Sequence, residues 1–265
     1  MEEQKVWFRN SKGQKLCGLI ASQKKRAPAI ILVHGLMPRT DKHEYGLYDS
    51  LAKKLFSAGF SVFRFDFGGH GESDGDYVDV RVAQEVNDLK YAIDFFLKQN
   101  IDKNNLGLIS TSFGATPTIL LADKRIKAFQ LTSPYIILDK HAQYVFSRNC
   151  GENWKIELEK TGFMTVKRFT PTDIRRQRIG KLLIEDIKSL NMTREIKKIK
   201  KPIFIISGGK DRYVDIKNVR ALFKAANKPK KLKIVPFADH NLYGSPKEKK
   251  IFLEETIKWF KKNLK

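Results

Sequence analysis

Apolar residues recur along this chain in two alternating patterns. Short runs rich in valine, isoleucine and phenylalanine are separated by longer stretches in which apolar residues repeat every three or four positions. The first pattern predicts β-strands and the second predicts amphipathic helices. We expect strands at residues 5–10, 14–22, 27–35, 61–67, 105–111, 126–134, 202–209 and 231–237.

The clearest helical pattern follows Asp79, with apolar residues spaced alternately by four and three positions: Val82, Val86, Leu89, Ile93 and Phe96. We expect further helices at 46–60, 218–226 and 248–264, and one that begins at Phe113. The first two strands flank "SKG" and predict an opening hairpin. The remaining strand–helix alternation predicts an α/β fold with a mostly parallel, doubly wound sheet of about eight strands, whose ligands lie at the carboxyl ends of the strands.

This alternation breaks between residues 135 and 201. The segment 153–169, "NWKIELEKTGFMTVKRF", alternates through Trp154, Ile156 and Leu158 before a Lys-Thr-Gly turn, which predicts a hairpin. The following segment, 171–190, has a helical pattern. We interpret residues 1–265 as one domain and about 136–200 as an insertion that caps the carboxyl edge of the sheet.

The formal net charge is +22. Such a charge is compatible with a nucleic acid, an anionic membrane surface or acidic substrates as partners. The basic residues, however, are spread along the chain, and the densest runs (194–202 and 227–233) are not interleaved with aromatic residues as in a groove that follows a nucleic-acid strand. We therefore do not expect nucleic acid to be the main partner.

The N-terminal residues, the apolar runs and the cysteines indicate the cellular compartment and bear on whether a metal is bound. The opening "MEEQKVWF" has no apolar core of a signal peptide, and no window has the roughly 18–20 apolar residues of a membrane span. Cys17 and Cys150 match no metal-ligand spacing and are expected to be reduced thiols. We expect a cytoplasmic protein with no membrane span, no metal and no cofactor.

Three hydroxyl residues stand in a row in "LISTSFGAT": Ser110, Thr111 and Ser112. A serine on a sharp strand-to-helix turn can act as a nucleophile, and that turn needs small residues two positions before and after the serine. Only Ser112 meets this condition, because Ser110 and Gly114 occupy those positions. The alternative for these hydroxyls is a structural one, the capping of a helix.

A serine nucleophile needs a base and an acid, which follow it in the order acid, then histidine. Asp211 lies just past the strand at 202–209, and His240 lies just past the strand at 231–237. Both would reach the same edge of the sheet as the serine. Asp215 is a rival acid that can instead cap the following helix, Asp66 is another candidate, and Asp239 is interpreted as structural.

An oxyanion requires hydrogen-bond donors. We expect these to be the backbone amides of Phe113, at a helix start, and of Leu36, after "ILVHG". His34 is expected to brace that loop, and His70 to lie in a tight glycine-rich turn rather than in a phosphate-binding loop. The sequence around His43 and His141 indicates no functional role for either histidine.

Taken together and in order, "VHGL", "FRFDFGGHGESDG", "STSFG", "GGKDRYVD" and "ADHN" resemble the α/β-hydrolase superfamily over essentially the whole chain. The chain is most similar to cinnamoyl/feruloyl esterase-like and serine-aminopeptidase-like hydrolases, which carry a short cap at the place of the insertion. The resemblance implies Ser112 as nucleophile, His240 as base, Asp211 as acid, and Leu36 with Phe113 as oxyanion donors. The chain has Ser110 where glycine is usual, and in this feature it resembles bacterial acyl-transfer thioesterases of the luminescence type.

The leading hypothesis is a serine hydrolase that cleaves a carboxylic ester through an acyl-enzyme. Alternatives are an acyl thioesterase or acyltransferase on fatty-acyl substrates, a peptidase, and a non-catalytic ligand-binding protein of the same fold. The expected partner is a small-molecule acyl ester or thioester, and the expected assembly is a monomer or homodimer.

Overall fold

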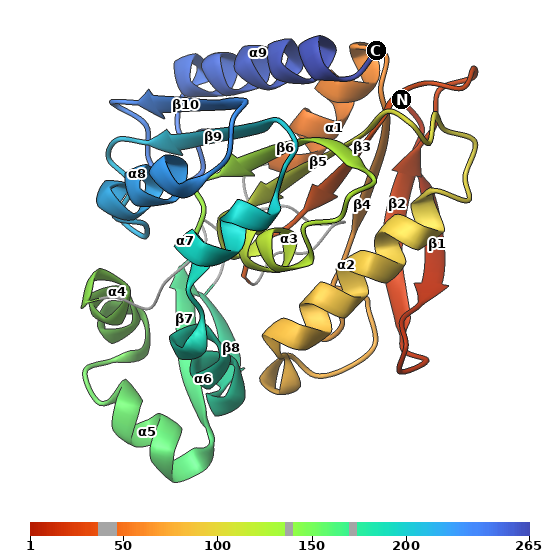
Figure 1. Ribbon diagram of the computed structural model, residues 1–265. Helices are drawn as coiled ribbons and strands as arrows, with labels where there is room; N and C mark the ends of the chain where they lie inside the picture. Colours follow the sequence, from red (N-terminus) through yellow and green to blue (C-terminus); the bar gives the residue numbers. More distant parts are fainter. Residues whose placement is uncertain (37–46, 136–139, 170–173) are drawn as a thin grey trace.

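The structure is a computed structural model that describes residues 1–36, 47–135, 140–169 and 174–265. Within these residues an eight-stranded sheet has the order β1-β2-β4-β3-β5-β6-β9-β10 (Figure 1). Its strands are β1 Gln4–Arg9, β2 Lys15–Ala21, β3 Ala29–Val33, β4 Ser61–Phe65, β5 Leu106–Thr111, β6 Ile126–Thr132, β9 Ile203–Gly208 and β10 Lys230–Val235. Each of the predicted strands of the sheet is present.

The sheet is antiparallel at one end and parallel elsewhere. β1 and β2 form the predicted hairpin, with Trp7 opposite Cys17, and β2 pairs antiparallel with β4. The other neighbouring strands are parallel. Every residue of β3, β4, β5 and β9 is buried, which explains why their sequences are nearly continuous apolar runs.

Helices cover both faces of the sheet. On one face lie α1 (Leu47–Ser57) and α9 (Pro246–Asn263), whose buried residues share a cluster with Ile30 of β3. On the other face lie α2 (Val82–Phe96), α3 (Ala115–Leu121) and α8 (Ile216–Ala225). This two-sided cover confirms the doubly wound architecture.

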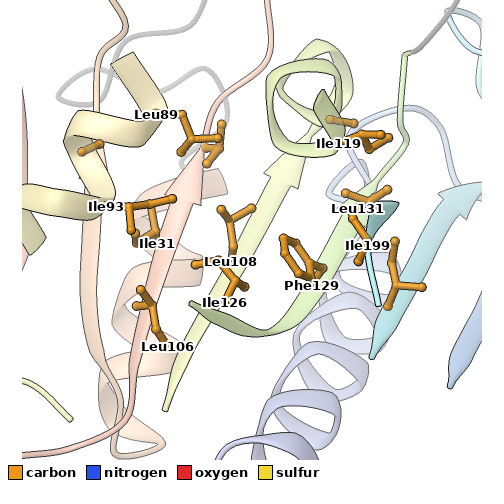
Figure 2. Close-up of a cluster of buried hydrophobic side chains, with 14 of the residues drawn as sticks. Ile31, Leu89, Ile93, Leu106, Leu108, Ile119, Ile126, Phe129, Leu131 and Ile199 are labelled. Carbon is orange, nitrogen blue, oxygen red and sulfur yellow. The ribbon is translucent and has the colours of Figure 1, made fainter. Parts of the chain in front are cut away.

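The predicted apolar stripe of α2 faces the sheet from Leu89 onward, whereas Val82 and Val86 pack with residues of the segment between β6 and β9. Leu89 and Ile93 lie in the same buried cluster as Ile31 of β3 and Leu108 of β5, together with Ile119 of α3 (Figure 2). A helix buries one stripe because its side chains return to the same face every three to four residues. Burial of Leu89, Ile93 and Phe96 therefore anchors α2 on this face of the sheet.

An insertion separates β6 from β9 (Figure 1). It contains α4 (Lys140–Cys150), α5 (Trp154–Thr161), β7 (Phe163–Phe169), β8 (Ile174–Gly180) and α6 (Lys181–Ser189), followed by the short α7 (Met192–Glu195). β7 and β8 pair antiparallel in a separate two-stranded sheet. The buried residues of the insertion share a cluster, here called the insertion cluster, with residues of the main domain: Tyr77, Val80, Val82, Phe113, Phe146, Trp154, Leu158, Met164, Val166, Ile179, Leu183, Ile184 and Ile187.

The predicted hairpin at 153–169 was wrong in its first half. Residues 154–161 form α5, in which Trp154 and Leu158 are buried one helical turn apart and Ile156 is 66% exposed. Alternation over three residues does not separate a strand from a helix whose buried positions are four apart. The Lys-Thr-Gly sequence ends α5, because Gly162 has a φ of 81° and donates its N–H to the Leu158 carbonyl.

The predicted helix at 171–190 was also wrong over residues 174–180, while residues 171–173 lie outside the described residues. Residues 174–180 form β8, which pairs with β7, and only 181–189 form a helix, α6. Pairing buries Met164, Val166 and Ile179 in the insertion cluster, which outweighs the helix propensity of the arginine-rich sequence. Gly180 is the last residue of β8 and the N-cap of α6, and it packs so closely on Val78 that a Cβ there would collide with the Val78 carbonyl oxygen.

Candidate active site

Ser112 lies on the sharp turn between β5 and α3. Its φ is +53°, a left-handed conformation that is rare for residues other than glycine and costs on the order of 1–3 kcal/mol. The flanking residues are as small as the turn requires: Ser110 is fully buried, and a Cβ on Gly114 would collide with the His34 carbonyl oxygen. The turn thus presents Ser112 half-buried at the carboxyl end of β5, while Thr111 belongs to the strand.

Asp211 and His240 meet at the same edge of the sheet. Asp211 follows β9 and His240 follows β10, and His240 Nδ1 lies 2.8 Å from Asp211 Oδ2. The other Asp211 oxygen, Oδ1, accepts the backbone N–H groups of Tyr213 at 2.8 Å and Val214 at 3.0 Å. The carboxylate is 1% exposed and its orientation is fixed on both sides, so it can hold the imidazole ring in one tautomer.

The residues that follow β6 connect the serine turn to the histidine loop. Ser133 Oγ donates to the His240 carbonyl oxygen at 2.6 Å, and the Tyr135 N–H donates to the Ser112 carbonyl oxygen at 3.0 Å. Ser133 has a φ of +44°. Sequence reasoning missed both residues, although Ser133 lies at the carboxyl end of the predicted strand 126–134, at the ligand-bearing edge.

The loop after β3 lies against the serine turn. A Cβ on Gly35 would be 2.9 Å from Ser112 Cβ and 3.5 Å from the Phe113 backbone nitrogen. This glycine permits the close approach of the loop after β3 to the turn at Ser112 and Phe113. Gly35, which precedes the expected donor Leu36, thus packs on the turn that carries the other expected donor, Phe113.

His34 braces this loop. Its Nε2 accepts the Phe67 N–H at 3.2 Å, so Nδ1 carries the proton and donates to the Gly35 carbonyl at 2.7 Å. Burial lowers the pKa of His34 below its ordinary value of 6.5, against the attraction of Asp66. A neutral ring satisfied at both nitrogens has the structural role expected from the sequence.

The rival acids are engaged elsewhere. Asp215 is the N-cap of α8 and accepts the Lys217 N–H at 2.8 Å. Asp239 accepts the backbone N–H of its neighbour His240 at 2.7 Å, not the ring. Asp66 is fully buried and accepts the Glu72 N–H at 3.1 Å. Of these carboxylates, Asp211 is the one that contacts the imidazole.

Next to His34 is a buried pair that the sequence did not indicate, since the His34 and His70 ring centroids are 4.9 Å apart. His70 lies in the expected glycine-rich turn, and its Nε2 is 3.9 Å from Oε1 of Glu85. Burial lowers the pKa of His70 well below 6.5, and burial together with the Asp88 carboxylate raises the pKa of Glu85 well above 4.5. Both shifts favour the neutral form of the group concerned. His43 and the His141 side chain lie outside the described residues.

The described ranges contain no group of three or more His, Cys, Asp or Glu residues that could hold a metal ion. Cys17 and Cys150 are not joined in a disulfide, and burial raises the pKa of Cys150 to about 12. No helix in the described part of the chain is long and apolar enough to cross a membrane.

Comparison with protein families gives one match that covers just over half of the chain. The family described as serine aminopeptidase, S33, matches residues 24–157. An uncharacterized 31.7 kDa protein in the traX-finO intergenic region of Escherichia coli is 34% identical over 103 residues, and a second protein of that description is 35% identical over 88 residues. These matches span only about a third of the length of either curated relative.

Solved structures share the fold over the whole chain. The α/β hydrolase GrgF from Penicillium sp. sh18 has a TM-score of 0.79 at 19% identity, covering 100% of this chain and 99% of that one. The Pyrococcus furiosus esterase Pf2001 has a TM-score of 0.75 at 21% identity, covering 100% and 92%. Est1E from Butyrivibrio proteoclasticus, solved with ferulic acid bound, has a TM-score of 0.75 at 18% identity, covering 97% and 98%.

Proposed function

Since the chain belongs to the serine aminopeptidase S33 family and has the α/β-hydrolase fold, we propose that it is a serine hydrolase that cleaves carboxylic esters through an acyl-enzyme. The observation that carries this proposal is the 2.8 Å contact between His240 Nδ1 and Asp211 Oδ2 at the sheet edge that also holds the strained Ser112 turn. A serine hydroxyl is a weak nucleophile unless an adjacent base takes its proton.

In the acylation step, Ser112 Oγ attacks the ester carbonyl carbon while neutral His240 accepts the hydroxyl proton at Nε2. The Asp211 carboxylate keeps Nδ1 protonated and stabilises the imidazolium that forms. His240 then transfers the proton to the alkoxide oxygen as the bond between the carbonyl carbon and that oxygen breaks. The alcohol departs and Ser112 is left acylated.

Developing negative charge on the carbonyl oxygen requires donors placed before the reaction begins. The backbone N–H groups of Phe113 and Leu36 are the proposed donors, supported by the close packing of Gly35 on Ser112 and the Phe113 nitrogen. Each such donor contributes on the order of 2.7–4 kcal/mol of transition-state stabilisation. His34, neutral and bonded on both sides, positions the loop that carries Leu36.

Deacylation repeats the same chemistry with water. His240 accepts a proton from water as its oxygen attacks the acyl carbon, and returns that proton to Ser112 Oγ as the acyl–oxygen bond breaks. The products are a carboxylic acid and the free enzyme. The cycle requires no metal and no cofactor.

The insertion is proposed to be a cap that forms the acyl side of the site, within a single domain of residues 1–265. Phe113 is a member of the insertion cluster, and Leu36 and Tyr135 pack against it. The acyl chain of the substrate would thus meet apolar side chains next to the proposed oxyanion donors. This environment supports an ester of an apolar acid as the substrate class.

The proposed function is tested by labelling with a fluorophosphonate probe. Wild type should be labelled, Ser112→Ala should not, and Ser110→Ala should be labelled like wild type. Ser110 is a matched control because its buried hydroxyl has no hydrogen-bond partner among the described residues and lies two positions away. Equal labelling of Ser112→Ala and wild type would exclude Ser112 as the nucleophile, and an unlabelled wild type would contradict the proposed function.

A further inference from the structure

Tyr213 places an exposed aromatic ring against the imidazole of His240. The two ring centroids are 5.1 Å apart with an interplanar angle of 60°, an edge-to-face contact. The Tyr213 backbone N–H is bonded to Asp211 Oδ1, so the same residue contacts both members of the acid–base pair. Its side chain is nevertheless 46% exposed, which is unusual for a large aromatic residue in this protein.

The contact between this ring and His240 matters because the proposed leaving group has to pass close to His240. Because His240 Nδ1 is committed to Asp211, the proton reaches the departing oxygen from Nε2. Proton transfer requires that oxygen within about 3 Å of Nε2. Atoms attached to the oxygen must then lie within a few ångströms of the imidazole, and the exposed Tyr213 ring is in contact with that imidazole.

The two sides of the proposed site differ in composition. On the oxyanion side, Phe113 and Leu36 belong to or pack against the insertion cluster. On the histidine side, Tyr213 is one of the few large hydrophobic residues that the described chain exposes. The acyl and alcohol parts of an ester would therefore contact different residues.

We propose that Tyr213 determines specificity for the alcohol part of the substrate, favouring alcohols that present a flat apolar face to its ring. This inference rests on the proposed ester hydrolysis and adds the leaving-group class to it. The ring provides the contact, because aromatic pairs gain from edge and face packing beyond simple burial. The Tyr213 hydroxyl is not required.

The test compares esters that share one acid and differ in alcohol. Rates of ethyl butyrate and benzyl butyrate hydrolysis are measured for wild type, Tyr213→Phe, Tyr213→Leu and Tyr213→Ala. We expect Tyr213→Ala and Tyr213→Leu to lower kcat/KM for the benzyl ester about threefold to tenfold more than for the ethyl ester. Tyr213→Phe should retain the wild-type preference.

Separate measurement of the acylation and deacylation rate constants distinguishes a Tyr213 ring that contacts the substrate from one that only supports His240. Leaving-group recognition acts only on acylation, so the deacylation rate constant of the butyryl-enzyme should be the same in wild type and Tyr213→Leu. A purely supporting role would lower both steps, for both esters, by the same factor, and this result would overturn the inference. Trp7→Ala is the matched control, because Trp7 is 47% exposed on β1 at the opposite end of the sheet.

Failure of the proposed ester hydrolysis itself would give a different set of results. A wild-type protein that neither hydrolyses these esters nor reacts with the fluorophosphonate would overturn the proposed function and this inference with it. An active wild type whose alcohol preference is unchanged in Tyr213→Leu and Tyr213→Ala would overturn only the role of Tyr213.

Discussion

The Ser133 hydroxyl donates a 2.6 Å hydrogen bond to the backbone carbonyl of His240, 107 residues further along the chain. This bond ties the loop after β10 to the end of β6, two strands away in the sheet. The position of the proposed base therefore depends on a residue that has no part in the chemistry.

Ser133→Ala should lower both stability and activity. Loss of the bond leaves the His240 carbonyl without this donor and should cost about 1 kcal/mol of unfolding free energy. A loosened histidine loop should lower kcat for ester hydrolysis about tenfold. Urea unfolding and initial rates measure the two effects. Ser207→Ala is the control, because the buried Ser207 hydroxyl has no partner among the described residues; an equal loss in both variants would contradict the role of the Ser133 bond.

Asp211→Asn should remove most activity and leave the fold intact. An amide cannot hold the protonated Nδ1 tautomer, and kcat should fall about 10³- to 10⁴-fold. The control is Asp215→Asn, which retains the α8 cap and should keep both rate and stability. Unchanged turnover in Asp211→Asn would assign the acid role to Asp215 or Asp66 instead.

Gly114→Ala should disrupt the serine turn. The added Cβ would collide with the His34 carbonyl oxygen, so either the turn or the His34 loop must shift. We expect loss of fluorophosphonate labelling and a stability loss of about 1–3 kcal/mol. At Gly13, where a Cβ meets open space, Gly13→Ala should label normally at a cost of about 1 kcal/mol for its positive φ. Normal labelling of Gly114→Ala would show that the close approach is not needed.

Glu85 should make the protein less stable as the pH rises. Burial, then the Asp88 carboxylate, raises the folded-state pKa of Glu85 well above 4.5. Between 4.5 and that raised pKa the folded protein retains a proton that the unfolded chain releases, so the unfolding free energy falls with increasing pH. Glu85→Gln removes this penalty, and its stability relative to wild type should increase from about pH 5 to about pH 8 in urea unfolding.

A suitable comparison for this titration is Glu254→Gln, on the exposed surface of α9. Its stability should follow that of wild type across the same range. A constant difference between Glu85→Gln and wild type at both pH values would show that Glu85 is ionised in the folded protein.

The sheet and its flanking helices were predictable because burial imposes regular spacing. Strands buried on both faces are continuous apolar runs, and α2 repeats its apolar residues at helical intervals. In the insertion the runs are shorter, and the three-residue alternation at 154–158 fits either conformation. Packing determines that this segment is helical, because a helix buries Trp154 and Leu158 in the insertion cluster and leaves Ile156 exposed to solvent.

For the candidate site, local sequence was sufficient for the three residues whose types and order along the chain indicate one chemistry. Ser112, Asp211 and His240 each lie within a few residues of the end of a strand, and the sheet order brings the ends of β5, β6, β9 and β10 to one edge. Ser133, Tyr213 and Glu85 could not be assigned in this way. Their importance arises from contacts with residues on other elements, which depend on the packed structure and not on spacing along the chain.

The order of the strands along the chain also determines when, during synthesis, the proposed nucleophile and its base are both present. The turn with Ser112 is complete once β3, β5 and α3 are made, whereas the proposed base follows β10, the last strand added to the sheet. Under the proposed mechanism, more than a hundred residues are synthesised after the nucleophile Ser112 before the base His240 that activates it. Reaction with the fluorophosphonate would then report that the final strand has docked.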